Sequence, residues 1–71
     1  MNEETRYQKA IDRLAWYMHM SIVCCAGTSE HTSYLDNLVA GSAIVHILSG
    51  KSYAEVDADV TATFDKCYRE R

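Results

Sequence analysis

The segment Ser49-Gly50-Lys51-Ser52 contains the Gly-Lys-Ser sequence that closes a phosphate-binding P-loop. In a P-loop, backbone N–H groups and the lysine hold phosphates at the start of a helix. The full pattern also needs a glycine five positions before Gly50, and that position is Val45, inside a predicted helix. The sequence therefore argues against a nucleotide hydrolase.

Two predicted helix starts could still hold a small anion such as a nucleotide, because their N–H groups are unpaired and lie at the positive end of the helix dipole. At the start of the third helix, the set is Lys51, Ser52, Arg6, Tyr7 and Lys9. At the start of the second, the set is Thr28, Ser29, His31, Arg69 and Arg71, with Lys66 close by. The commoner explanations are a capped turn with a solvated lysine and a frayed basic C-terminus.

The residues Cys24, Cys25, His31 and Cys67 could by count form a zinc site. Adjacent helical residues point about 100° apart, so Cys24 and Cys25 can rarely bind one ion. Packed thiols are the better interpretation, and we expect no metal and no cofactor. His19 and His46 have no nucleophile or carboxylate in a recognisable relation to them, so we expect a protein that is not an enzyme.

Charge and composition limit the remaining classes. The 71 residues carry a net charge of −3, which makes nucleic acid an improbable main partner, although local basic clusters remain open. The N-terminal residues are acidic and polar, unlike a secretory signal. The longest uncharged apolar run, Leu38 to Ser49, is far short of the ~20 residues that span a membrane. We expect a soluble cytoplasmic protein without membrane contact.

Glycines divide the chain, which has no proline, into three segments. Gly27 and Gly50 each follow an apolar periodic stretch and precede a Ser or Thr, as at a helix end followed by a new cap. Helices are predicted over about 3–25, 30–49 and 53–69. The fold class is all-α: one domain over residues 1–71, with three helices in an up-down-up arrangement.

The second predicted helix is apolar nearly all round from Leu38 onward, so it is expected at the centre of the structure. Gly41 and its small neighbours would let another helix approach closely there. The third helix begins with a capping box, Ser52 to Glu55, and its single apolar stripe predicts a peripheral position.

Three helices cannot cover all the apolar residues of the first two. The set left outside is Trp16, Tyr17, Met20, Ile44 and Ile47. Such patches usually mark an interface, so we expect a homo-oligomer, either a dimer or a larger closed assembly.

The hypothesis for function is a small non-enzymatic binding protein, such as an accessory or virus-encoded inhibitor. It would either sequester a nucleotide-like anionic ligand as a sponge or block a larger protein through the acidic third helix, which carries Glu55, Asp57, Asp59 and Asp65. The alternative is a small regulatory DNA-binding protein of the helix-turn-helix type. It ranks lower because acids occupy the first half of the third helix, where bases would be read.

Overall fold

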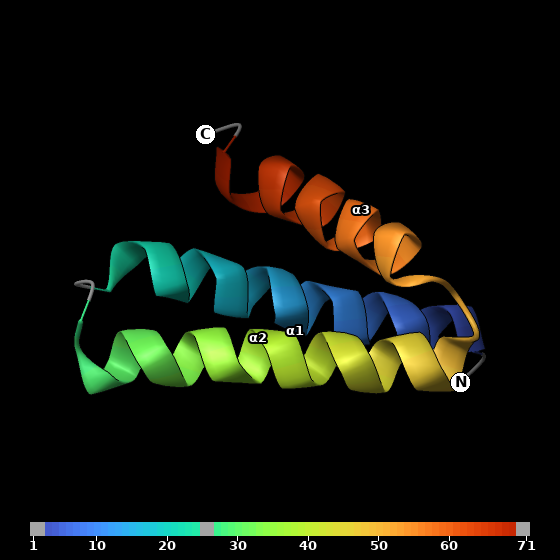
Figure 1. Ribbon diagram of the computed structural model, residues 1–71. Helices are drawn as coiled ribbons and strands as arrows, with labels where there is room; N and C mark the ends of the chain where they lie inside the picture. The colour runs from blue at the N-terminus through green and yellow to red at the C-terminus, as the bar shows by residue number, and fades with distance from the viewer. Residues whose placement is uncertain (1–2, 25–26, 70–71) are drawn as a thin grey trace.

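The chain forms three helices in a computed structural model that describes residues 3–24 and 27–69. Helix α1 spans Glu3–Val23, α2 spans Ser29–Ser49 and α3 spans Tyr53–Phe64, and the π-helical turn η1, Asp65–Arg69, continues α3. The helices α1 and α2 form a long antiparallel hairpin, and α3 returns obliquely across α1 (Figure 1). The prediction of an all-α, three-helix domain is confirmed.

Local signals fix the helix ends where the sequence placed them. The Thr28 hydroxyl accepts from the His31 N–H at 3.2 Å, and the Ser52 hydroxyl accepts from the Glu55 N–H at 3.2 Å. The Ser52 hydroxyl in turn donates to the Glu55 carboxylate at 3.4 Å. Gly50 ends α2 with φ of 74°, a left-handed conformation that side chains other than glycine's rarely adopt.

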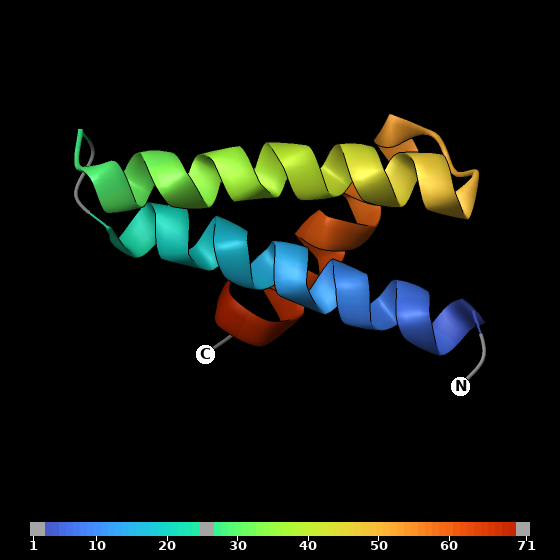
Figure 2. The same ribbon diagram turned by 90° about the horizontal axis from the view of Figure 1, so that it is seen from below.

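The core lies between α1 and α3. Its buried apolar side chains are Ile11, Leu14 and Ala15 from α1 and Val56, Val60 and Phe64 from α3. Within the described part of α2 the one buried residue is Ser42. Helix α1 lies between the other two in Figure 1, and in Figure 2 α3 crosses behind α1. The expectation that α2 would be the central helix is therefore wrong, and α1 takes that place.

Helix α2 packs on α1 through a close approach at Gly41. A Cβ atom at this position would lie 2.5 Å from Cδ2 of Leu14, which is well inside van der Waals contact. Leu38 and Val45 flank Gly41 on the same face and pack against the core as partly buried residues. The predicted close approach at the small residues is confirmed, and its partner is α1.

Helix α3 is too short to cover the hairpin. Its 12 residues give about 18 Å of helix against about 32 Å for the 21 residues of α1. The turn η1 lies on the far side of α1 from α2 (Figures 1 and 2). The predicted second anion set requires this part of the chain beside the turn between the first two helices, and the tilt of α3 leads η1 elsewhere. None of the helices in the described ranges is long and apolar enough to cross a membrane.

The contact at Gly41 yields a prediction whose sign depends on Leu14. Gly41→Ala alone should lower the free energy of unfolding by about 1 kcal/mol. The clash with Leu14, which is buried and cannot move aside, outweighs the ~1 kcal/mol gain in helix propensity. In a Leu14→Ala background, the same substitution should raise it, because only the propensity gain remains. Urea unfolding of the four proteins of this cycle measures both signs. Stabilisation by Gly41→Ala in the wild-type background would contradict the contact.

Candidate functional site

Lys51, the residue singled out by the Gly-Lys-Ser sequence, lies in a cluster with Tyr7 and Asp59. Its ammonium nitrogen is 3.7 Å from Oδ2 of Asp59 and lies 4.3 Å from the centre of the Tyr7 ring. The Tyr7 hydroxyl donates a hydrogen bond to the same Asp59 oxygen. The cluster therefore joins the start of α1, the α2–α3 turn and the middle of α3.

The environment of Tyr7 favours the neutral phenol. Burial, the hydrogen bond to Asp59 and the negative charges of Asp59 and Glu55 together raise the pKa of Tyr7 far above its ordinary value. A phenol that stays protonated remains a hydrogen-bond donor over the whole physiological range. Tyr7 is thus suited to hold the Asp59 carboxylate in place and is poorly suited to act as a base.

His46 fixes the turn that carries Lys51. Its Nδ1 lies 2.5 Å from the carbonyl oxygen of Lys51, and since a carbonyl can only accept, this nitrogen carries a proton. The imidazole stacks on the Tyr53 ring with centroids 4.1 Å apart and planes at 25°. His46, which the sequence left without a role, therefore connects the last turn of α2 to the first residue of α3.

The first predicted anion set is only partly brought together. Tyr7 and Lys51 meet, but Lys51 is already paired with a carboxylate. Arg6 and Lys9 lie on the other side of α1, because at 100° per residue they point roughly opposite to the fully buried Ile11. An anion at Ser52 would have to compete with Asp59 for the lysine.

The residues of the second predicted anion set are also separated. Thr28 caps α2, and His31 Nδ1 lies 2.8 Å from the carbonyl oxygen of Ser21, which ties the start of α2 to the end of α1. Arg69 pairs with Asp65 at 3.2 Å within η1, across α1 from α2. Ser29 hydrogen bonds to the Glu30 carboxylate at 3.4 Å. Arg71 lies outside the described residues.

The cysteines and histidines do not form a metal centre in the described ranges. No group of three or more His, Cys, Asp or Glu side chains there surrounds a point where a cation could bind. Cys24 is half-buried after the end of α1, and Cys67 is exposed on η1. Cys25, the remaining thiol of the predicted set, lies outside the described residues.

The five residues predicted for the oligomer interface fall into two groups. Trp16, Tyr17 and Met20 are half-buried on α1. Ile44 and Ile47 are 57% and 73% exposed on α2. Ala40 and Ala43 follow the same helical spacing, and all four side chains face away from the core contacts of this helix. We call these four residues the α2 outer stripe.

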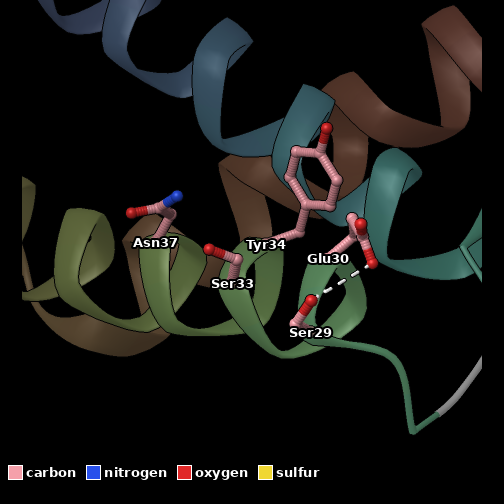
Figure 3. A pocket seen from close by; sticks show the side chains of 5 residues that line it. All are labelled: Ser29, Glu30, Ser33, Tyr34 and Asn37. Carbon is pink, nitrogen blue, oxygen red and sulfur yellow. Dashed lines mark hydrogen bonds between the residues drawn. The ribbon is translucent and has the colours of Figure 1, made fainter.

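An aromatic cluster joins α1 to the first half of α2. The Trp16 ring meets the Tyr34 ring edge-on at 5.6 Å, and Tyr17 lies 5.5 Å from Trp16 and 6.4 Å from Tyr34. The guanidinium of Arg13 lies over the Trp16 ring at 5.7 Å. Beside this cluster is a shallow depression of about 320 Å³ on α2. Figure 3 shows Tyr34 rising from the helix among its other lining residues, Ser29, Glu30, Ser33 and Asn37.

The sequence interpretation missed Arg13, although a signal for it was present. Arg6, Lys9, Arg13, Trp16 and Met20 follow one another in steps of three and four, and so form one face of a helix. We call this face the α1 outer stripe. Its N-terminal half is basic and its C-terminal half is aromatic and apolar, a pattern hidden when the cations and rings are assigned to separate sites.

Protein-family models, curated protein sequences and solved structures were compared with this chain, and none of them matches it.

The raised pKa of Tyr7 makes stability depend on pH in a defined direction. Since the folded-state pKa lies above the unfolded value of about 10, the contribution of Tyr7 is fully present below pH 10 and is lost as pH rises further. The stability difference between wild type and Tyr7→Phe should therefore shrink above about pH 10.

Urea unfolding at several alkaline pH values measures this difference, with Tyr53→Phe as the control, because Tyr53 is 50% exposed. A difference for Tyr7→Phe that stays constant with pH would show that Tyr7 and Asp59 are not coupled as described.

Proposed function

We propose that this chain is a small non-enzymatic binding protein that works as a homo-oligomer. The observation that carries the proposal is that α2, whose second half is almost wholly apolar, contributes no buried apolar side chain to the core. Its exposed large residues are Leu35, Val39, Ile44, Ile47 and Leu48. A contiguous apolar surface of this kind usually marks an interface.

Charge favours a second copy of the chain as the partner on this face. Between Asn37 and Ser49 the sequence has no Asp, Glu, Lys or Arg, so two such faces can meet without burying an ionised carboxylate or a Lys or Arg side chain. The acids Glu55, Asp57 and Asp65 belong to α3 and η1, which Figure 1 shows above α1, whereas α2 lies below it. The face that can self-associate is thus the one without the charges that would oppose it.

Side-chain size supports the same partner. Ala40 and Ala43 on the α2 outer stripe are small enough to let a second helix approach closely, while Ile44 and Ile47 supply area. A twofold axis near Ile44 would place the α2 outer stripe of one chain against the same stripe of the second copy, as an isologous interface requires. Trp16 and Tyr17 already pack on Tyr34, so the α2 outer stripe carries the proposal.

The assembly acts by binding a partner, which is either a small anion or a larger protein. In the sponge version, it holds a nucleotide-like anion. In the inhibitor version, the acids of α3 block a basic surface of a larger protein. The alternative, a helix-turn-helix DNA-binding protein, has less support, because α1 and α2 form a long antiparallel hairpin and the shorter α3 carries Glu55, Asp57 and Asp59 in its first half.

Ile44→Asp tests the assembly. In the oligomer an aspartate here would bury an unpaired charge, whereas in the single chain the side chain at this position is 57% exposed. The variant should therefore fall from a multiple of 8.0 kDa to one chain and keep its helical circular dichroism.

Size-exclusion chromatography with light scattering measures the mass, and Thr61→Asp, an exposed α3 position, serves as the matched control that stays assembled. A monomeric wild type, or an oligomer unchanged by Ile44→Asp, would contradict the proposed interface.

A further inference from the structure

We infer that the α1 outer stripe binds a short single-stranded nucleic acid, with cations on its phosphates and aromatic rings against its bases. This inference deepens the anionic-ligand version of the proposed function, and it moves the ligand from the helix starts to the exposed side of α1. Its starting point is that Arg6, Lys9 and Arg13 are exposed and form no ion pair within the described residues.

The other described cations do not form such a group. Lys51 pairs with Asp59 and Arg69 pairs with Asp65, so their charges are partly neutralised, and Lys66 is a single exposed cation on η1. The α1 outer stripe contains no acid at any of its five positions. In a chain of net charge −3, three cations thus gather on a face that an anion can approach without meeting a carboxylate of the stripe.

The length of the basic half suits a chain of phosphates. Arg6 and Arg13 are seven residues apart, which is about 10 Å along a helix. A stacked strand carries one phosphate per about 3.4 Å, so this distance covers about three phosphates. A single nucleotide would leave at least one of the three cations unused, which favours a strand as the ligand.

The aromatic half supplies what a base needs. Trp16 lies one helical turn after Arg13, whose guanidinium is over the Trp16 ring, and Tyr17 and Tyr34 pack beside that ring. Aromatic rings and guanidinium planes stack on unpaired bases of any sequence. Bases of a duplex are stacked on one another, so a single strand is the form that these rings can reach.

The depression beside Tyr34 extends the surface onto α2. Ser33 and Asn37 offer hydroxyl and amide groups to the edge of a base, and Glu30 can accept from an exocyclic amino group (Figure 3).

An anionic membrane would need apolar side chains free to insert. Here Trp16 is half-buried and packed on Tyr34, so the membrane is the weaker match.

Fluorescence anisotropy with a labelled single-stranded DNA of about twelve nucleotides, near the middle of the range for such sites, tests the inference at low salt. Binding by the wild type is expected. The triple variant Arg6→Gln/Lys9→Gln/Arg13→Gln should bind at least tenfold more weakly. Its plot of log affinity against log salt should be less steep by about 2, since about 0.7 counterions are released per phosphate contact. Trp16→Leu should weaken binding about tenfold and leave that slope unchanged.

Lys66→Gln removes an exposed cation from η1 and is the matched control, expected to bind like the wild type. Absence of binding at low salt, or equal binding by the triple variant, would overturn the inference. So would competition by adenosine monophosphate as strong as that by the strand, or preferential binding to vesicles containing phosphatidylserine. Light scattering on the same samples reports assembly separately, so failure here is distinguishable from failure of the α2 interface.

Discussion

The approach of α2 to α1 at Gly41 is the constraint from which the rest of this structure follows. Leu14 fills the space that a side chain at residue 41 would need, so the two helices lie close over a long antiparallel contact. Leu14 belongs at the same time to the core that α1 builds with α3. One side chain thus couples both helix pairs, and α1 becomes the helix packed from two sides.

This arrangement decides which surfaces remain open. The central helix α1 packs Ile11, Leu14 and Ala15 against its two neighbours, and the basic half of the α1 outer stripe, on the opposite face, stays exposed. Helix α2 contacts α1 through one narrow strip that includes Gly41, so most of its apolar residues stay exposed. Helix α3 is too short to cover them. The small core and the large exposed apolar surface both follow from the central position of α1.

The cluster of Tyr7, Lys51 and Asp59 shows how a sequence motif can serve structure. The Gly-Lys-Ser residues suggest phosphate binding, but the lysine charge is met by Asp59 and the Tyr7 ring. The cluster fixes the α2–α3 turn against α1, and His46 holds the carbonyl of the same lysine. Three cations without an ion pair in the described residues lie instead together on the α1 outer stripe, away from the helix start to which the sequence assigned Arg6 and Lys9.

The sequence by itself determined the local structure. Gly50, Ser52 and Thr28 set helix ends through backbone conformation and caps, which depend on neighbours within a few residues. Apolar spacing predicted the three helices and the single apolar stripe of the third. The small residue Gly41 marked a close helix contact before its partner was known.

Only the tertiary structure decided which helix is central, because hydrophobicity shows that a face avoids water without showing what covers it. Of the three α-helices, α2 is the most apolar and yet the least buried. The reason is that α3 is too short to cover it and that Leu14 fixes how α2 packs on α1. The partner of Lys51, Asp59, likewise depends on how α3 packs beside the turn, whereas Arg69 and Asp65 are one helical turn apart and their pairing follows from spacing. Ion pairing removes cations from the set that a ligand can use, and for Lys51 only the folded chain shows this pairing.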